Sequence, residues 1–197
     1  CLMLADIKAA FPSVAHLFLH AVIGAMFMPS GFVNYTKGLY FNNTACSFGD
    51  EGLAILYYIL CGVVQGCPLS GSLWVMCFDP FLTMMRQWLP DSVRRAFADD
   101  FAIIVKRLSN LATIDKAFRI LRRSAGLEIR PKKCVIIILG WGRDKLLYQE
   151  AINWVQVEVE NFKDFVFVQV GEYLGTFVGP QATNEMIWKD SLAKFEV

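Results

Sequence analysis

The stretch "RAFADDFAIIV", Arg95–Val105, sets two adjacent carboxylates, Asp99 and Asp100, inside an apolar run typical of a buried strand. A buried charge is costly unless it is paired or bound to a metal ion, and two carboxylates in contact also repel each other. The run therefore predicts two strands joined by a tight turn at the aspartates. The turn is either an ordinary exposed β-turn, where Asp is common, or part of a cation site.

A third carboxylate ends another apolar run, because "CLMLADIK" predicts a buried strand that finishes near Asp6. Carboxylate oxygens are the ligands that Mg²⁺ prefers, and carboxylates from two strand ends are typical of two-metal phosphoryl-transfer sites. On these residues alone, the exposed turn and the metal site both stay open.

The remaining patterns mix helices and strands without regular βαβ alternation, which favours an α+β fold. Residues 29–52 are rich in Gly, Asn and Ser and predict turns and short strands, whereas 52–63 fit either a strand or a buried helix. Helices are predicted over 12–27, 73–89, 110–126 and from 185, a loop over 64–72, a strand over 132–141 and a hairpin over 164–179.

Composition excludes several classes of protein. Hydrophobic residues make up 55% and charged residues 19% of the 197, which indicates a folded domain rather than a disordered chain. Mean hydropathy is +0.42, but the longest apolar runs fall short of the ~18 residues of a spanning helix, so no membrane association is expected. The six cysteines form no C-x-x-C pair and are expected to be free, mostly buried thiols.

Positive charge gathers in one segment. Residues 106–145 hold 11 Lys and Arg against 3 Asp and Glu, although the whole chain has a net charge of +1. Such a block is either a solvated helix face or a track for a polyanion. Six of its residues are candidates for contacts with phosphates: Arg119, Arg122, Arg123, Arg130, Lys132 and Lys133.

Five blocks in this order cover nearly the whole chain: "MLADIKAAFPSV", "GVVQGCPLSGSL", "FADDFAIIV", "GLEIRPKKC" and "GEYLGTFVG". Together they resemble motifs A to E of the reverse transcriptase palm of non-LTR (LINE-type) retrotransposons. The resemblance implies an antiparallel palm sheet with helices packed on one face. It also implies palm segments at 1–28 and 61–180, a partial fingers insert at 29–60 and the start of a thumb helix at 181–197.

The resemblance also implies the catalytic centre. Asp6, Asp99 and Asp100 correspond to the family's metal ligands, with the backbone carbonyl of Ile7 as a secondary ligand. They are expected to hold two Mg²⁺ ions, with Mn²⁺ as a substitute. Phe11 occupies the position of the steric gate, whose ring leaves no room for a ribose 2′-OH and so favours dNTPs. Simple core packing is the other interpretation of Phe11.

The other motifs imply contacts with substrates. Gln65 and Gly66 correspond to the motif B pair beside the incoming nucleotide. Lys132 and Lys133 correspond to motif D, where Lys133 is expected to give a proton to the leaving pyrophosphate; a surface lysine is the alternative. Gly171, Tyr173, Leu174 and Gly175 belong to the hairpin that grips the primer, with Tyr173 and Leu174 as its packing core.

The implied function is RNA-directed DNA polymerisation on an RNA template and a DNA primer. Three residues depart from the family pattern, Pro12, Val64 and Arg130. An inactive remnant that still folds, or another palm polymerase such as a viral RNA-dependent RNA polymerase or a telomerase-like enzyme, are the alternatives. Because the chain begins at Cys1, we expect it to be a piece of a polyprotein that supplies the missing parts of the fingers and thumb; an endonuclease domain is a further part that the sequence leaves open. We expect the protein to act inside the cell, and in the nucleus if the host is a eukaryote.

Overall fold

The computed structural model describes residues 1–50, 52–140 and 144–193, with side chains described as far as Trp188. The chain forms two compact units. The first comprises Cys1–Ile7, Met85–Phe118 and Ile129–Val197, and the second comprises Lys8–Met84 and Arg119–Glu128. Each unit is described by itself.

The described strands are β1 (Leu2–Lys8), β2 (Thr44–Gly49), β3 (Gly52–Tyr58), β4 (Val93–Phe97), β5 (Asp100–Ile104), β6 (Glu128–Ile129), β7 (Val135–Ile137), β8 (Val166–Phe167), β9 (Gly171–Tyr173) and β10 (Thr176–Val178). The described helices are α1 (Ala10–Ser13), α2 (His16–Ala25), α3 (Ser30–Tyr40), α4 (Ser70–Trp88), α5 (Asn110–Ala125), α6 (Lys145–Glu158) and α7 (Asn184–Ala193), with 3₁₀ turns η1 (Pro131–Lys133) and η2 (Glu160–Phe162).

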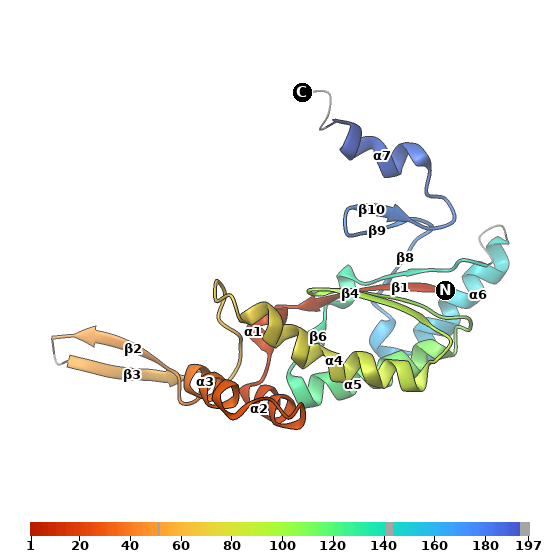
Figure 1. Ribbon diagram of the computed structural model, residues 1–197. Helices are drawn as coiled ribbons and strands as arrows, with labels where there is room; N and C mark the ends of the chain where they lie inside the picture. The colour runs from red at the N-terminus through yellow and green to blue at the C-terminus, as the bar shows by residue number, and fades with distance from the viewer. Residues whose placement is uncertain (51, 141–143, 194–197) are drawn as a thin grey trace. The chain divides into compact units, whose positions relative to one another are not determined.

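The first unit is built on a sheet with the strand order β4-β5-β1-β7-β8, and β6 also pairs with β1. Strand β1 runs antiparallel to both β5 and β7, whereas β7 and β8 are parallel. The α+β fold with a mainly antiparallel sheet is therefore confirmed. The first half of α5 lies on one side of this sheet and the β9–β10 hairpin on the other (Figure 1).

Side chains of β1 alternate between the two faces of the sheet, as the pleat requires. On the face toward α5, Phe101 packs edge-on against Phe118 of that helix, with ring centroids 6.0 Å apart. The opposite face carries an apolar cluster of Leu2, Leu4, Ala102 and Ile137, against which Val135, Val168, Tyr173 and Val178 pack. Since Asp6 follows Leu4 by two positions, it belongs to this second face.

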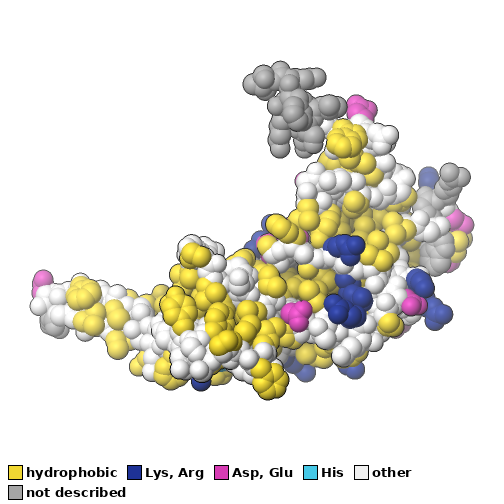
Figure 2. All heavy atoms as spheres, viewed as in Figure 1, with side chains coloured by type: hydrophobic (Ala, Val, Ile, Leu, Met, Phe, Trp, Pro, Cys, Tyr) yellow, Lys and Arg dark blue, Asp and Glu magenta, His cyan; other side chains and the backbone are white. Residues whose placement is uncertain are grey.

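The second unit contains α1 to α3, the β2–β3 hairpin and most of α4. Its buried His16 lies with Nε2 2.8 Å from the carbonyl oxygen of Gly62. All of β3 is exposed, and large apolar side chains line the hairpin, as Figure 2 shows. Of the two predictions for this segment, the strand is therefore confirmed for residues 52–58, and their apolar side chains are exposed and not part of a core.

One segment differs from expectation in this unit. Turns and short strands were predicted over residues 29–52, and this is wrong for the first part, because α3 spans Ser30–Tyr40. Thr36 and Tyr40 are its buried residues, one helical turn apart, and they anchor it. Gly31 and Gly38 suggested a loop, but both sit where a side chain would meet only open space.

The long helices agree with the sequence patterns. Helix α4 contains Pro80 as expected, and α5 ends at Ala125, followed by Gly126, whose φ of +76° is the left-handed conformation of a C-terminal cap. Helix α6 was not predicted, although Asp144 caps it by accepting hydrogen bonds from Leu146 N–H and Leu147 N–H. Its buried residues, Ala151 and Val155, are four positions apart, and this helical spacing of apolar residues is the sequence signal that was missed.

None of the helices in the described part of the chain is long and apolar enough to cross a bilayer. All six cysteines are free, as predicted. Only Cys77 and Cys134 are buried, however, so the expectation of mostly buried thiols is wrong. Burial raises the pKa of the Cys77 thiol to about 12 and that of Cys134 to about 11, which leaves both protonated and unreactive at neutral pH.

Candidate functional site

The two adjacent aspartates lie at the turn between β4 and β5, as the sequence predicted. Phe97 pairs with Asp100 across the ladder, so Ala98 and Asp99 form a two-residue turn. Ala98 has a φ of +49°, a conformation that residues with a Cβ rarely adopt. The carbonyl of Asp99 accepts a hydrogen bond from Ile7 N–H at 3.1 Å, which ties this turn to the end of β1. The strained turn is thereby held in place by the neighbouring strand.

Asp6 and Asp100 are direct cross-strand neighbours in the β1–β5 ladder. Side chains at such positions stand on the same face of the sheet, and like charges there are destabilising. Burial raises the pKa of the Asp100 carboxyl, and the nearby charges of Asp99 and Asp6 raise it further. The three carboxylates that the sequence singled out therefore act on one another in the folded protein.

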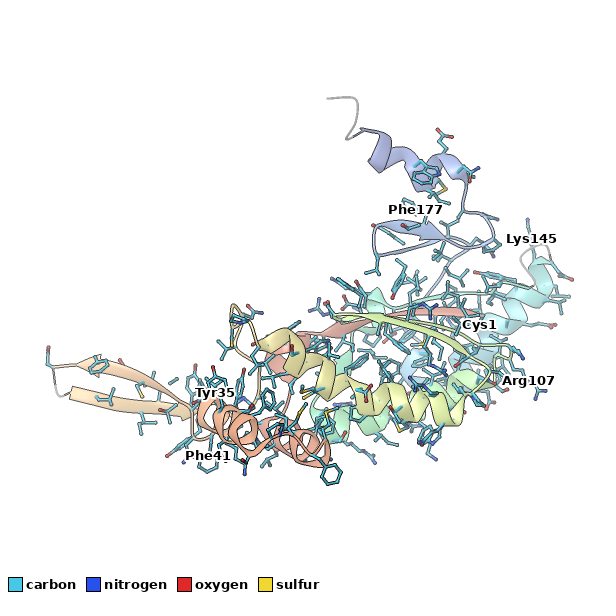
Figure 3. All side chains as sticks on the ribbon, in the orientation of Figure 1. Cys1, Tyr35, Phe41, Arg107, Lys145 and Phe177 are labelled. Carbon is cyan, nitrogen blue, oxygen red and sulfur yellow. The ribbon has the colours of Figure 1, made fainter. Side chains whose placement is uncertain are left out.

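A cavity of about 280 Å³ lies over this pair of aspartates. Its lining residues come from β1, β5, η1, β7 and β9: Leu4, Ala5, Asp6, Asp100, Lys133, Val135, Glu172 and Tyr173. The cavity thus joins carboxylates with one lysine beneath the β9–β10 hairpin. Figure 3 shows side chains between the sheet and this hairpin, which carries Phe177.

Asp6 has one strongly desolvated oxygen. Its Oδ1 is buried and lacks a hydrogen-bond partner among the described residues. The Nε of Arg130 lies 3.3 Å from it, which is an ion-pair distance, but the two groups do not have hydrogen-bond geometry. The backbone N–H of Arg130 donates to the Asp6 carbonyl at 2.9 Å. Arg130 was noticed in the sequence as a candidate for contacts with phosphates and as a departure from the family pattern, but its contact with Asp6 was not foreseen.

The predicted motif D lysines lie in the 3₁₀ turn η1, immediately after Arg130. Both side chains are exposed, but of the two only Lys133 lines the cavity. Its backbone N–H donates to the Arg130 carbonyl at 2.9 Å, so the turn has a fixed shape. The structure brings Lys133 to the aspartates and leaves Lys132 outside the cavity.

The predicted primer-grip hairpin is formed by β9 and β10, with Leu174 and Gly175 as a two-residue turn of positive φ. Gly171 packs closely on the sheet, where a Cβ would come within 3.1 Å of the Leu4 and Ile137 side chains. Tyr173 packs against the apolar cluster, but Leu174 is 50% exposed at the tip of the turn. The expectation that Leu174 forms part of the packing core is therefore wrong.

The Tyr173 hydroxyl faces the same carboxylates. Its oxygen is buried and has no hydrogen-bond partner among the described residues. Burial raises the pKa of this phenol, the charge of Asp100 raises it further, and Arg95 opposes the shift. Tyr173 thus stays a neutral donor above the aspartates, available to a group that enters the cavity.

The donor set fits a hard divalent cation in part. Asp6 offers a poorly solvated carboxylate, and Asp100 is a destabilised one whose charge a cation would relieve. Within the described ranges, no group of three or more His, Cys, Asp and Glu side chains is close enough to hold a metal ion. Asp6 and Asp100 are therefore the residues that the structure brings together for a cation, and Asp99 adjoins them through the turn.

The remaining predicted residues belong to the second unit. Phe11 is half-buried and stacks on Trp74, with ring centroids 5.5 Å apart, and its carbonyl accepts a hydrogen bond from Val63 N–H at 2.8 Å. Gln65 and Gly66 lie exposed in a loop, where Gly66 has a φ of +85°. The loop therefore needs glycine at this position, and its backbone is accessible.

The strain at Asp100 makes a testable prediction. The pKa of Asp100 is higher in the folded protein than the ordinary value of 3.8 that it has in the unfolded chain. The folded protein therefore loses stability as the pH rises from 3.8 through the raised pKa, because Asp100 then becomes charged beside Asp6 and Asp99. At about pH 8 and without divalent cations, Asp100→Asn should raise the Tm by roughly 2–5 °C. Thermal unfolding followed by circular dichroism measures this change.

The matched control is Asp91→Asn, because the Asp91 side chain is 77% exposed and pairs with an exposed lysine. Its Tm should stay within about 1 °C of the wild type. Adding Mg²⁺ should stabilise the wild type more than Asp100→Asn. A lower Tm for Asp100→Asn in the metal-free protein would contradict the repulsion inferred here.

Comparison with known proteins adds independent findings. The family model described as "Reverse transcriptase (RNA-dependent DNA polymerase)" matches residues 1–176. The Retrovirus-related Pol polyprotein from type-1 retrotransposable element R2 of Bradysia coprophila is 28% identical over 200 residues, covering 96% of this chain and 23% of that protein. The Retrovirus-related Pol polyprotein from type-2 retrotransposable element R2DM of Drosophila melanogaster is 28% identical over 154 residues, which cover 74% of this chain and 14% of that protein. The chain therefore spans less than a quarter of the length of these relatives.

Solved structures agree on the fold. Apo telomerase from Candida tropicalis superposes with a TM-score of 0.65 at 13% identity, covering 90% of this chain and 31% of that one. Telomerase from Candida albicans in complex with a fragment of telomeric RNA gives a TM-score of 0.60 at 11% identity, covering 90% and 29%. At these identities the likeness concerns the fold alone.

Proposed function

The chain belongs to the reverse transcriptase family, and from this premise we propose that it carries the catalytic centre of an RNA-directed DNA polymerase. One observation supports the proposal above the others. Asp6 and Asp100 face each other on neighbouring strands and share a cavity with Lys133. Carboxylates at strand ends, together with a positively charged lysine, suit the transfer of a nucleotidyl group to a primer 3′-OH.

Divalent cations, Mg²⁺ or Mn²⁺, would be held by Asp6, Asp99, Asp100 and the carbonyl of Ile7. When bound, they supply charge neutralisation for the triphosphate and a lowered pKa for the primer hydroxyl. The residues fit this task because Asp100 is destabilised by its neighbours in the metal-free protein. The Ile7 N–H bond to the Asp99 carbonyl keeps the two ligand-bearing strands together.

The protein's own groups divide the remaining work. Lys133 lines the cavity and would donate a proton to the leaving pyrophosphate. Phe11 would exclude a ribose 2′-OH, and Gln65 and Gly66 would contact the incoming nucleotide, with the backbone of Gly66 able to approach closely. Tyr173, Gly171, Leu174 and Gly175 would hold the primer strand near the aspartates.

The proposal assigns substrates and partners of three kinds: an RNA template, a DNA primer and dNTPs. In domain terms, we assign 1–28 and 61–180 to the palm, 29–60 to part of the fingers and the segment from 181 to the start of a thumb, of which 194–197 lie outside the described residues. The fingers, the rest of the thumb and an endonuclease are the further parts that such an enzyme would use. A nuclear place of action follows if the host is a eukaryote.

Primer extension tests the proposal. The chain is expressed in its complete reading frame and supplied with an RNA template, a DNA primer and Mg²⁺. We expect extension with dNTPs, at least about 10-fold less with rNTPs, and none with EDTA. Equal use of rNTPs would indicate an RNA polymerase instead. A folded protein that extends no primer with either substrate would identify an inactive remnant.

A further inference from the structure

We propose that Arg130 is the internal counter-ion of the metal-free site: it neutralises Asp6 when no cation is bound and thereby sets how much cation is needed to load the site. The inference rests on the proposed function, because it takes Asp6 as a metal ligand. It goes beyond that function because the role foreseen for Arg130 there was contact with phosphates and not with Asp6. Arg130 acts through Asp6, so it is a positioning residue and not a catalytic one.

The contact itself is the first support. Arg130 Nε and Asp6 Oδ1 are 3.3 Å apart, and the Arg130 side chain is 39% exposed against 22% for Asp6. The same Oδ1 atom is buried and has no hydrogen-bond partner in the described part of the chain. A buried carboxylate oxygen without a hydrogen bond is costly. The guanidinium charge is the compensation that the structure gives it.

The charges around Asp6 are the second support. Asp6 stands directly across the ladder from Asp100, and Asp99 immediately precedes Asp100 in the sequence. Three carboxylates in one place repel one another. Among the described residues, three basic side chains lie near these groups. Lys133 lines the cavity, and the charge of Arg95 acts on Tyr173. Arg130 is the one of the three that is in ion-pair contact with Asp6.

The position of Arg130 is fixed by the backbone and not by the ion pair. Its N–H donates to the Asp6 carbonyl at 2.9 Å, and its own carbonyl accepts from Lys133 N–H at 2.9 Å and from Cys134 N–H at 3.1 Å. Substituting the side chain leaves these three bonds possible. A variant of Arg130 therefore removes the charge while the main chain still holds Asp6 in place.

The direction of the effect follows from this geometry. Because the side-chain contact lacks hydrogen-bond geometry, its contribution is mainly that of one charge near another. A positive charge close to a ligand oxygen stabilises the empty site and repels an incoming cation. Removing it should therefore weaken the metal-free fold and tighten cation binding. A merely structural role would weaken both.

The test measures both quantities on one set of variants, in the complete reading frame. Mn²⁺ binding is followed by the electron paramagnetic resonance signal of the free ion, and stability by thermal unfolding in EDTA. We expect Arg130→Gln to bind Mn²⁺ about 3–30-fold more tightly and to lose roughly 2–5 °C of Tm in EDTA. Arg130→Lys, which keeps the charge, should stay within about 2-fold of the wild-type Kd.

Lys106→Gln is the matched control, because it removes another basic residue from an ion pair of similar length, 3.2 Å to Asp91, in the same unit. Both side chains of the Lys106–Asp91 ion pair are at least 74% exposed, so Lys106→Gln should change neither the Mn²⁺ affinity nor the Tm. The double variant Asp6→Asn/Arg130→Gln covers the case in which Arg130→Gln folds poorly. With both charges gone, it should be more stable in EDTA than Arg130→Gln alone.

The outcomes separate the two proposals. Unchanged or weaker Mn²⁺ binding by Arg130→Gln, beside normal binding by the wild type, overturns the counter-ion role and leaves the proposed function intact. The absence of Mn²⁺ binding by the wild type as well as every variant overturns the proposed metal site, and the counter-ion role with it. Tighter binding together with lower metal-free stability supports the inference.

Discussion

Asp6→Asn and Asp99→Asn are each expected to lower the rate of dNTP incorporation by about 10³-fold, while the protein stays folded. Both changes keep the size and shape of the side chain and remove its charge. Asp6 lines the cavity, and the Asp99 carbonyl ties the turn to β1 through a bond that Asn retains. The loss should therefore fall on charge-dependent chemistry, as measured by single-nucleotide primer extension at saturating dNTP.

Asp164→Asn is the control for this experiment, because Asp164 is an exposed carboxylate of the same unit. It should keep full activity. Circular dichroism of each variant shows whether the fold persists. If Asp99→Asn kept more than about a tenth of the wild-type rate, Asp99 would be only a turn residue, which is the ordinary role of Asp in such loops.

The second large effect concerns the choice of sugar. Phe11→Val should raise incorporation of rNTPs relative to dNTPs by about 10–200-fold, because the shorter side chain leaves space for a 2′-OH. The half-buried Phe11 ring stacks on Trp74, so part of it is packed and part is accessible. The measurement compares kcat/KM for matched rNTP and dNTP pairs on one RNA template.

Phe11→Tyr serves as the matched variant, since it keeps the ring and should keep the preference for dNTPs. A purely structural Phe11 gives a different pattern. Phe11→Val would then lower the Tm and reduce the use of both substrates equally, with their ratio unchanged. That result would assign Phe11 to the packing of the second unit and leave the sugar preference to other residues.

The sequence predicted the fold class, the strand pair at Asp99 and Asp100 and the ends of α5, because these depend on local patterns. An apolar run interrupted by a tight turn defines the β4–β5 hairpin, and a glycine of positive φ follows the last residue of α5. The family resemblance supplied the order of the site residues. It also placed Asp6 and Asp100 in one centre, and the ladder register agrees with that placement.

What local patterns missed depends on tertiary packing. Helix α3 holds two glycines, and the burial of Thr36 and Tyr40 favours the helix against that local signal. Leu174 resembled a core residue, but the two-residue turn exposes it. The contact of Arg130 with Asp6 joins residues from β1 and from the start of η1, and no spacing in the sequence indicates it.

The place of β1 in the sheet has a consequence for biosynthesis. This strand comes first in the chain, yet its partners follow about a hundred residues later. The Cys1 nitrogen donates a hydrogen bond to the Val105 carbonyl across a separation of 104 residues. Translation at roughly 5–20 residues per second leaves the apolar β1 segment without its neighbours for several seconds. Pairing of such distant strands is also slow once they are made. The apolar strand that carries Asp6 is therefore expected to stay unpaired until β5 and β7 have been synthesised.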